Sequence, residues 1–524
     1  MSQYLKEGWM LKWIIGSMLI LFALVVVPLN QGQEKPKGSA ELYDFALELY
    51  YQGKYTESID NFSRLIQTFP DSKSVPYSVH MIGQCYSRMG KLEEVIQQFE
   101  LYLRTFADGD RRKEVEKGIQ AAQDGLKERA VSPPSQPALT TSIPSAIKTV
   151  KRRICAQVFF FNSETLEEVE KRIKDLKKAG IDTLILRVFQ TKGDRMYPFA
   201  NPRYEEGVYF RTEYAPVVDD LLGKITEIAH RNELDIFAWM TTRYADYGVD
   251  ENSDLRCVRY NFETKKMEAS RGFSLFHPEA LKRLQGLFRD LGRYPIDGIL
   301  FQDDLILRHN EDFHAEALKA FLKEFGYAPH PDLFYIDPYR SESGKYYVKA
   351  YTDRFWSWVN WKNRWLMNVA QQLMLAARES RPDLQFGINL YFEAVLNHSN
   401  GVAWFSQNLS EALKKDFDYY AVMAYHRQTM RELNMEEQRT IRLMAEVAQK
   451  AVQSTGDPAR VMMKLQILDW KSNEMLPVKE MDEILTAILD HGNVSLAFVP
   501  YVETFPFHLL KGRWIPVSPN NRKE

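Results

Sequence analysis

The sequence predicts an α/β protein whose larger part is a (β/α)8 barrel of the TIM type. From about residue 154 onward, short apolar runs alternate with amphipathic runs, which indicates parallel strands joined by right-handed helical crossovers. One apolar run, Gly298–Phe301, ends just before two acids, Asp303 and Asp304. Acids at the carboxyl end of a buried strand are typical of a barrel mouth, where the chemistry of such folds takes place.

Composition excludes several classes of protein. The 524 residues suffice for about two to four domains. Lys and Arg (68) nearly balance Asp and Glu (70), leaving a net charge of −2, so we expect no nucleic-acid partner. The three cysteines form no CxxC pair, which indicates neither a structural zinc nor a disulfide framework. We expect no metal and no other cofactor.

The amino terminus predicts a membrane anchor. Lys6 and Lys12 precede the uncharged apolar run Trp13–Leu29, whose 17 residues are near the lower limit for a transmembrane helix. The flanking lysines favour an amino terminus in the cytoplasm. We therefore expect residues 1–29 to be an uncleaved inner-membrane anchor in a bacterial envelope, with the body in the periplasm, or exported if the signal is cleaved. Residues 30–39 are then a tether.

Residues 40–128 are predicted to be all-α and repetitive. Gly53, Ile59 and Phe62 recur as Gly90, Ile96 and Phe99, an offset of 37 residues. The pattern resembles tetratricopeptide repeats, in which stacked helix pairs commonly bind proteins. We expect a protein partner here, such as an export complex, rather than a spacer alone. Residues 129–150 are rich in Pro and Ser and predict an extended linker.

Residues 151–524 are predicted to form the barrel. Its strands are predicted at Ala156–Phe161, Thr183–Phe189, Asp235–Met240, Gly298–Phe301, Gln385–Leu390, Tyr419–Ala424, Val461–Leu468 and Val494–Val499. The predicted helices include Leu166–Ala179, Val217–Arg231, Pro278–Leu291, Phe355–Arg378, Glu436–Gln453 and Val478–Asp490. Two long insertions, at about 191–216 and 241–277, follow the second and third strands and are expected to overhang the mouth.

Residues just after the predicted strands are acidic, amide or aromatic, as in sites that hold a sugar by its hydroxyls and ring faces. Glycoside cleavage needs two carboxyl groups in most families. The candidate catalytic residues are Asp303 and Asp304, with Glu393, Asp469 and Glu503 as other possible partners of Asp303. Of the residues at the strand ends, Asn389, Tyr425, Asp469 and Trp470 are candidates for binding substrate, and Trp239 and Gln466, within the strands, are further candidates.

Five separated segments make a family resemblance specific. They are DIFAWM (235–240), IDGILFQDDLIL (296–307), AWFSQN (403–408), YYAVMA (419–424) and LQILDW (465–470). In order and spacing they resemble the carboxyl-terminal domain of the poly-β-1,6-N-acetylglucosamine N-deacetylases of biofilm export, the PgaB type. The resemblance implies a β/α barrel that binds, and in some members hydrolyses, partially de-N-acetylated poly-glucosamine. It also implies that Asp303 is the catalytic acid and that Trp404 and Trp470 line the sugar groove.

The chain also departs from that family's pattern. Gln302 replaces an expected His, His309 replaces an expected acid, and His426–Arg427 replaces a Pro-Tyr pair. Nothing ahead of the barrel offers the Asp/His set of a deacetylase domain, so deacetylation is not expected.

Two functional hypotheses follow. The first is an envelope-anchored glycoside hydrolase that cleaves this biofilm exopolysaccharide through Asp303, alone or with an N-acetyl group of the substrate in place of the second carboxyl. The second is a non-catalytic polysaccharide-binding or escort module of an export system. Each site residue also has a purely structural interpretation: Asp303 as a helix cap, and Trp404 and Trp470 as core residues.

Overall fold

The computed structural model describes residues 38–51, 54–89, 91–106, 109, 111–131, 150–336, 339–340, 346–347 and 350–514. The predicted anchor (1–29) and most of the tether and linker lie outside these residues. Contacts divide the described chain into two units, the amino-terminal helices and the segment from Val150 onward. Within the described ranges, no helix is both long and apolar enough to span a bilayer.

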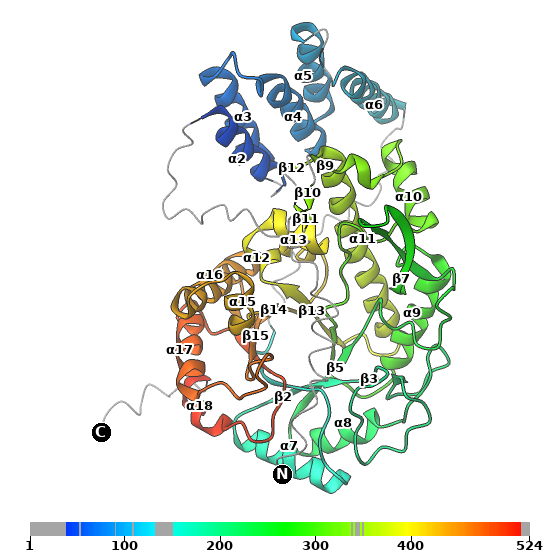
Figure 1. The fold of residues 1–524 in the computed structure, drawn as a ribbon, viewed down its shortest axis with the longest axis vertical. Helices are drawn as coiled ribbons and strands as arrows, with labels where there is room; N and C mark the ends of the chain where they lie inside the picture. The colour runs from blue at the N-terminus through cyan, green and yellow to red at the C-terminus, as the bar shows by residue number, and fades with distance from the viewer. Residues whose placement is uncertain are drawn as a thin grey trace, which may run out of the picture. The chain divides into compact units, whose positions relative to one another are not determined.

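The amino-terminal unit consists of successive packed helices (Figure 1). They are α2 (Ser39–Tyr51), α3 (Tyr55–Thr68), α4 (Val75–Arg88), α5 (Leu92–Thr105) and α6 (Arg112–Val131). The 37-residue sequence repeat is also a structural repeat. Helices α3 and α5 have 14 residues each, and each is preceded by a lysine and followed by a phenylalanine. Phe62 and Phe99, at matching positions, are both buried. The helical prediction is confirmed, while assignment to the tetratricopeptide class stays a prediction.

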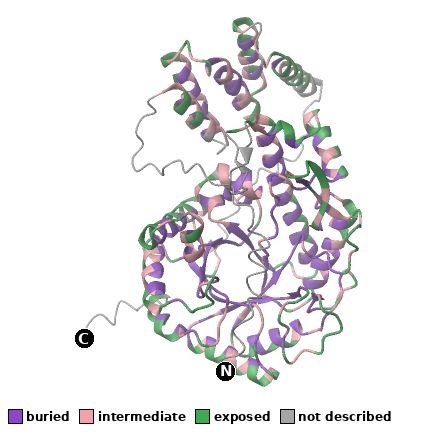
Figure 2. Cartoon of the chain, in the orientation of Figure 1, coloured by how far each residue is buried: buried purple, intermediate pink, exposed green. Residues whose placement is uncertain are grey.

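The second unit is a closed parallel barrel, as predicted. Its strands are β1 (Ile154–Val158), β2 (Thr183–Arg187), β5 (Asp235–Met240), β8 (Gly298–Phe301), β13 (Gln385–Tyr391), β14 (Tyr419–Met423), β15 (Val461–Gln466) and β16 (Ser495–Val499). Each pairs with its neighbours in chain order, and β1 closes on β16 through pairs such as Cys155 with Ala497. The strands are buried almost throughout, whereas the outer faces of the helices are exposed (Figure 2).

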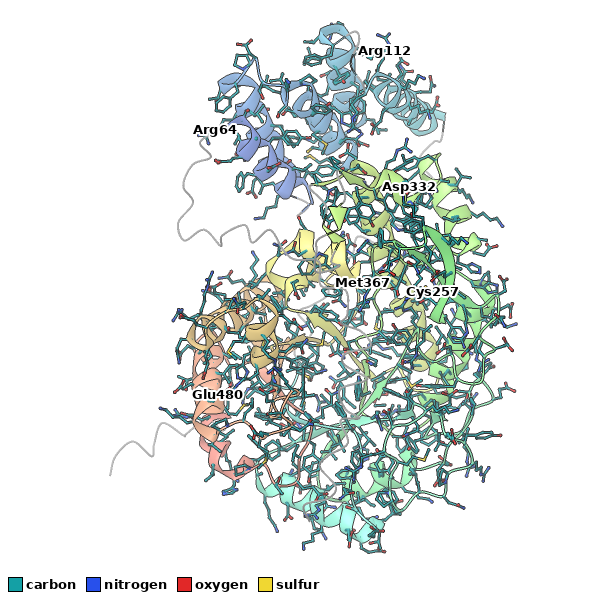
Figure 3. The ribbon with its side chains drawn as sticks, viewed as in Figure 1. Arg64, Arg112, Cys257, Asp332, Met367 and Glu480 are labelled. Carbon is teal, nitrogen blue, oxygen red and sulfur yellow. The ribbon has the colours of Figure 1, made fainter. Side chains whose placement is uncertain are left out.

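Helices cover the outside of the barrel (Figure 1). They include α7 (Leu166–Lys178), α8 (Leu222–Arg231), α9 (Pro278–Leu291), α11 (Asp353–Arg378), α16 (Glu437–Thr455), α17 (Val478–Leu489) and α18 (Phe507–Trp514). Their apolar stripes follow the 3.6-residue period and face the strands. Met367 of α11, labelled in Figure 3, is one such buried residue.

Most predicted elements differ from the observed ones only at their ends. β5, β8 and α9 have the predicted bounds, but β1 begins two residues earlier than expected and α8 begins at Leu222 rather than Val217. Residues 217–221 take part instead in the loop that pairs with the first insertion; Val217, for example, forms a bridge with Val208. Apolar periodicity alone does not distinguish such a buried loop from a helical turn.

Three insertions lie beyond the carboxyl ends of successive strands. The first contains the pair β3 (Phe189–Gln190) and β4 (Gly207–Val208), and the second the hairpin β6 (Arg256–Asn261) and β7 (Lys266–Phe273). The third, which the sequence did not indicate, follows β8. It comprises α10 (Ala315–Phe325), η1 (Pro331–Leu333), β9 (Tyr335–Ile336), β10 (Tyr339–Arg340), β11 (Tyr346–Tyr347) and β12 (Ala350–Tyr351).

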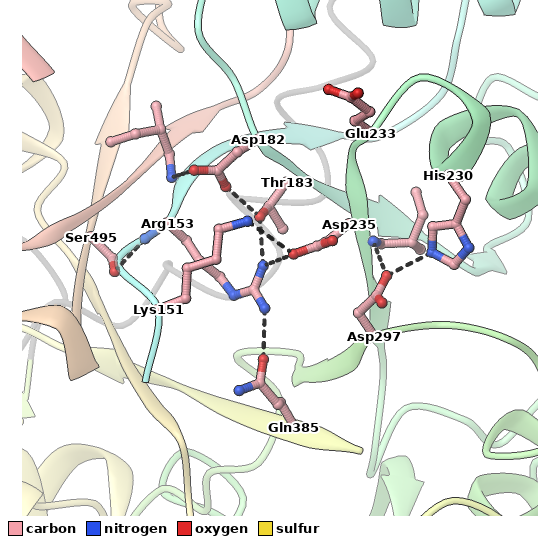
Figure 4. Close-up of polar contacts among 12 residues, drawn as sticks. Lys151, Arg153, Asp182, Thr183, His230, Glu233, Asp235, Asp297, Gln385 and Ser495 are labelled. Atoms are coloured by element: carbon pink, nitrogen blue, oxygen red, sulfur yellow. Dashed lines mark hydrogen bonds and ion pairs between the residues drawn. The ribbon is translucent and has the colours of Figure 1, made fainter. Parts of the chain in front are cut away.

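The amino end of the barrel is closed by one arginine. The guanidinium of Arg153 donates hydrogen bonds to Thr183 Oγ1 (2.9 Å), Asp235 Oδ2 (2.5 Å), Gln385 Oε1 (2.6 Å) and the hydroxyl of Tyr419 (2.8 Å). These acceptors stand at the starts of four different strands, and Figure 4 shows three of them around the guanidinium. The planar fork of arginine suits such a multiple acceptor set. Arg153 therefore ties the strand starts together.

Candidate active site

Asp303 stands at the barrel mouth, two residues beyond the end of β8. Glycine is required at position 298, where that strand begins, because a Cβ there would lie 2.4 Å from the ring of Phe237 on neighbouring β5. Asp303 is partly exposed, and no side chain in the described part of the chain donates a hydrogen bond to its carboxyl group. Burial raises the pKa of Asp303, while the positive charge of Lys464 opposes that rise. The carboxyl group is thus held in place but left open to a ligand.

The neighbouring acid is used differently. The carboxylate of Asp304 accepts hydrogen bonds from Thr241 Oγ1 (2.7 Å), from the amide (2.9 Å) and hydroxyl (2.9 Å) of Thr242, and from the amide of Tyr244 (2.8 Å). It is only 3% exposed. These bonds tie the loop after β5 to the loop after β8. The geometry favours a positioning role for Asp304, and its predicted catalytic role stays a prediction.

A buried lysine faces Asp303 from the barrel interior. Lys464 of β15 donates a hydrogen bond from Nζ to Asn389 Oδ1 of β13 (2.9 Å), across the intervening strand β14. Asn389 in turn donates to the carbonyl oxygen of Phe301 (2.9 Å). Burial lowers the pKa of Lys464 to about 8, and Asp303 counteracts part of that change. Asn389, predicted to bind substrate, therefore orients Lys464 instead of standing free.

Tyr425 and Trp470 form an aromatic corner beside Asp303. Their ring centroids are 4.6 Å apart in an edge-on arrangement. Both the charge of Asp303 and burial raise the pKa of Tyr425, so its hydroxyl is a neutral hydrogen-bonding group near that acid. Lys464 Nζ lies 6.0 Å from the centre of the same ring. The structure thus brings the predicted residues Asp303 and Tyr425 together, with Trp470 against Tyr425.

The other predicted binding residues are more scattered. Trp239 packs between Phe159 and Phe189, and its buried Nε1 has no hydrogen-bond partner among the described residues. Gln466 is buried, accepting from the amide of Gln428 and donating to the carbonyl of Leu468.

Trp404 and Asp469 lie on the rim. Trp404 is partly exposed on α13 (His398–Phe405), edge-on to Phe405. Asp469 forms a two-point ion pair with Arg431 at 2.8 Å from each oxygen. An ion-paired aspartate stays a carboxylate, so Asp469 is unsuited to donate a proton.

Glu393, unlike Asp469 and Glu503, forms no ion pair among the described residues. It is the first residue of α12 (Glu393–Leu396), which begins directly after β13. Its Oε2 is buried, and no partner for it exists among the described residues. Burial raises the pKa of Glu393 to about 8, and the negative charge of Glu432 contributes to the rise. Glu503, by contrast, pairs with Arg172 at 2.9 Å.

His309 and His426, at positions where the chain departs from the family pattern, have internal partners, and so does His314. His309 Nδ1 lies 2.5 Å from the hydroxyl of Tyr335, and burial lowers the pKa of His309 to about 3. His314 caps α10 and contacts Asp254. His426 and Arg427 both bind Glu480 of α17, labelled in Figure 3. Within the described residues, no group of three or more potential ligands is arranged around a metal site.

Sequence reasoning missed Lys464. The signal was present, because a lysine within the apolar run VMMKLQIL is rare unless its charge has a buried partner. The partner could not be identified, since Asp303 is 161 positions away in the chain.

Comparisons with known proteins identify the family of the barrel. The family model described as hypothetical glycosyl hydrolase family 13 matches residues 165–499. The poly-beta-1,6-N-acetyl-D-glucosamine N-deacetylase of Escherichia coli K12 is 25% identical over 296 residues, covering 53% of this chain and 39% of that protein. The corresponding protein of Escherichia coli O157:H7 matches with the same values. This chain thus spans about two fifths of the length of those curated relatives.

A solved structure supports the fold. The glycoside hydrolase domain of PgaB (BpsB) from Bordetella bronchiseptica superposes with a TM-score of 0.55 at 20% identity, covering 70% of this chain and all of that one. The predicted resemblance to the carboxyl-terminal domain of the PgaB type is confirmed.

Proposed function

The chain belongs to hypothetical glycosyl hydrolase family 13, and from this premise we propose that its barrel cleaves partially de-N-acetylated poly-β-1,6-N-acetylglucosamine within the polymer. The glycoside-hydrolase-like domain related to PgaB is the established part. The substrate, the internal site of cleavage and the catalytic role of Asp303 are the proposal.

The observation that carries the proposal is the state of Asp303. A carboxyl group at the end of the fourth barrel strand, partly exposed and without a side-chain donor among the described residues, is available to a sugar. The positive charge of Lys464 favours its ionised form. An anionic carboxylate stabilises the positive charge that develops on the sugar ring as a glycosidic bond breaks.

The surroundings of Asp303 support a glucosamine polymer as substrate. Tyr425 is partly exposed and packs edge-on against the buried Trp470, so its ring can contact a sugar. The carboxylate of Asp303 suits a substrate with free ammonium groups. The curated relatives are named for the acetylated form of this polymer.

We also propose the cellular setting. Residues 1–29 would anchor the protein in the inner membrane, and the repeat helices would bind a protein of the export system. Deacetylation is not proposed, because this chain aligns with only 39% of the curated deacetylases.

The test is incubation of the full chain with partially deacetylated poly-β-1,6-glucosamine, with product sizes measured by mass spectrometry. Shortened oligomers that disappear with Asp303→Asn are the expected result. The matched control is Asp383→Asn, because that aspartate is exposed and pairs only with Arg381 among the described residues. If the polymer is bound but stays intact, the escort function replaces the hydrolase; if it is neither bound nor cut, the proposed substrate is wrong.

A further inference from the structure

We propose that Glu393 is the proton donor of this site, the second carboxyl group that works opposite Asp303. This inference rests on the proposed hydrolase function. The family match does not name this group. Its support is the position of Glu393 after a neighbouring strand, the lack of hydrogen-bond partners of its Oε2 and the difference between its surroundings and those of Asp303.

Position comes from strand register. Ile388 of β13 pairs with Phe301 of β8, so the neighbouring strands end at the same level. Asp303 follows Phe301 by two residues and Glu393 follows Ile388 by five. The carboxyl ends of parallel strands meet at one mouth. Both acids therefore belong to the loops after adjacent strands, four and five, of the same opening.

The charges of both acids act on Tyr391. Burial raises the pKa of its hydroxyl, and the negative charges of Asp303 and Glu393 add to that rise. Its ring is held by stacking on Phe405 at 3.9 Å between centroids, with an interplanar angle of 8°. Tyr391 is the last residue of β13 and Glu393 the first of α12, so this ring stands at the carboxyl end of the barrel from which both acids follow.

The two acids differ in their charged neighbours. Burial raises the pKa of Asp303, but the positive charge of Lys464 opposes that rise and favours the carboxylate. Burial also raises the pKa of Glu393, the negative charge of Glu432 of α15 (His426–Glu432) adds to the rise, and Glu393 forms no ion pair among the described residues. Burial and the charge of Glu432 hold the pKa of Glu393 at about 8, so the group is protonated at neutral pH. Environments that separate two carboxyl groups in this way assign acid and base.

The remaining acids at the mouth are committed elsewhere. Asp304 is saturated by the backbone and side chains of the loop after β5. Asp469 and Glu503 pair with arginines, and Glu311 accepts from Arg243 at 3.1 Å. An arginine neighbour keeps a carboxylate ionised and therefore unable to donate. Glu393 forms no ion pair among the described residues, and its Oε2 is buried without a hydrogen-bond partner there. Asp312 and Glu503 each also have one such oxygen, but the amide of Val258 donates to Asp312 and Arg172 pairs with Glu503.

The chemical step follows directly. As the bond between the anomeric carbon and the glycosidic oxygen breaks, the proton of Glu393 moves to that oxygen, which leaves as an alcohol. Glu393 becomes a carboxylate, and the carboxylate of Asp303 stabilises the positive charge on the sugar. A water then supplies the oxygen that bonds to the anomeric carbon, and its released proton restores the neutral Glu393.

The test compares two leaving groups with the full chain. One substrate is the β-1,6-glucosamine polymer, whose leaving alcohol must be protonated. The other is a 2,4-dinitrophenyl glycoside of a β-1,6-linked glucosamine oligosaccharide, whose leaving group needs no proton. Glu393→Gln should lower kcat on the polymer by about 10²–10⁴-fold and leave kcat on the aryl glycoside within about threefold.

Control variants separate this role from a structural one. Asp303→Asn should lose activity on both substrates. Asp383→Asn, which changes an exposed aspartate paired with Arg381, should keep both. In the wild type, polymer cleavage should fall above about pH 8, as Glu393 loses its proton. This fall should be absent in Glu393→Gln, because the group that titrates there is gone.

The outcomes distinguish the inference from its premise. If wild-type protein cuts neither substrate, the hydrolase proposal fails and the donor with it. If wild-type protein cuts both and Glu393→Gln loses both equally, or keeps the polymer activity, the donor assignment is overturned while the hydrolase stands.

A measurement without activity tests the state of Glu393. Its folded-state pKa is raised, so the folded protein holds a proton that the unfolded chain releases above about pH 4.5. This contribution to stability is present below the unfolded pKa and is lost as pH rises toward about 8. The difference in unfolding midpoint between wild type and Glu393→Gln should therefore change across this window. A constant difference would show that Glu393 is ionised in the fold, which overturns the proposal.

Discussion

At the amino end of the barrel, the guanidinium of Arg153 has four hydrogen-bond acceptors from four strands. At the carboxyl end, the carboxyl groups of Asp303 and Glu393 have no side-chain donor among the described residues. Both ends of the barrel hold ionisable side chains. The protein supplies hydrogen-bond partners for the side chain at the amino end but no side-chain donors for those at the carboxyl end.

This difference indicates that stability and reactivity depend on opposite ends of one barrel. A buried charge that is fully hydrogen-bonded holds strands in register and is costly to disturb. A buried carboxyl group without partners weakens the fold but has a shifted pKa and open lone pairs, which is what catalysis requires. The hydrogen-bonded amino end (Figure 4) thus contrasts with a mouth whose carboxyl groups of Asp303 and Glu393 have no side-chain donor among the described residues.

The largest expected effect is on activity at the mouth. Asp303→Asn should reduce polymer cleavage by about 10³–10⁴-fold, because the charge that stabilises the oxocarbenium-like state is removed. The unfolding midpoint should stay the same or rise, since the variant breaks no side-chain hydrogen bond among the described residues. Initial rates and thermal melts on the same preparation check both. A large drop in midpoint would make Asp303 a structural acid and end the contrast.

The converse holds at the amino end. Arg153→Met should lower the free energy of unfolding by about 3–5 kcal/mol, because it leaves Asp235 without its buried partner. Activity per folded molecule should be unchanged. Denaturant unfolding with active-site-normalised rates tests this. The exposed variant Lys151→Met, which removes only the 3.3 Å contact to Asp235, is the matched control and should cost little.

Asp304 lies between these extremes. Asp304→Asn removes acceptor capacity from a carboxylate with several donors, and should cost about 1–3 kcal/mol of stability. The loop after β5 should loosen, and kcat should fall less than with Asp303→Asn. If instead activity is lost with full stability, Asp304 acts in the reaction directly, as the sequence suggested. Hydrogen exchange of residues 241–244 reports the loop.

The aromatic corner should give a smaller effect on binding. Trp470→Ala should weaken polymer binding roughly tenfold, the equivalent of about 1.4 kcal/mol for lost stacking, with kcat on saturating polymer changed less. Isothermal titration on the Asp303→Asn background measures affinity without turnover. Equal affinity would make Trp470 a core residue, in keeping with its 9% exposure.

The smallest expected effect is a shift in pH dependence. Lys464 favours the ionised form of Asp303. Lys464→Met removes that charge, so the pKa of Asp303 should rise and the acidic limb of the rate profile should move to higher pH. Its direction is the test: a shift to lower pH, or none, would mean that the two groups do not interact. Asn389→Leu, which removes the partner of Lys464 Nζ, should shift the limb in the same direction by less.

Much of the fold could be predicted because its signals are local. Short apolar runs and 3.6-residue stripes predicted the eight strands in order, and β5 and β8 match to the residue. The insertion after β8 was missed, because its two-residue strands such as β9 and β12 are too short to leave a pattern. Repeats at a 37-residue offset likewise predicted the paired helices α3 and α5.

The sequence by itself determined the barrel, the family and the acid pair Asp303–Asp304, since strand order and motif spacing are written along the chain. Only the tertiary structure decided how the acids differ. Which carboxylate meets the donors of Thr241 and Thr242, and which meets the buried Lys464, depends on closure of the barrel. The raised pKa of Glu393 depends on its burial and on the nearby charge of Glu432. Electrostatics act through space, and the chain alone does not specify distances between residues far apart in sequence.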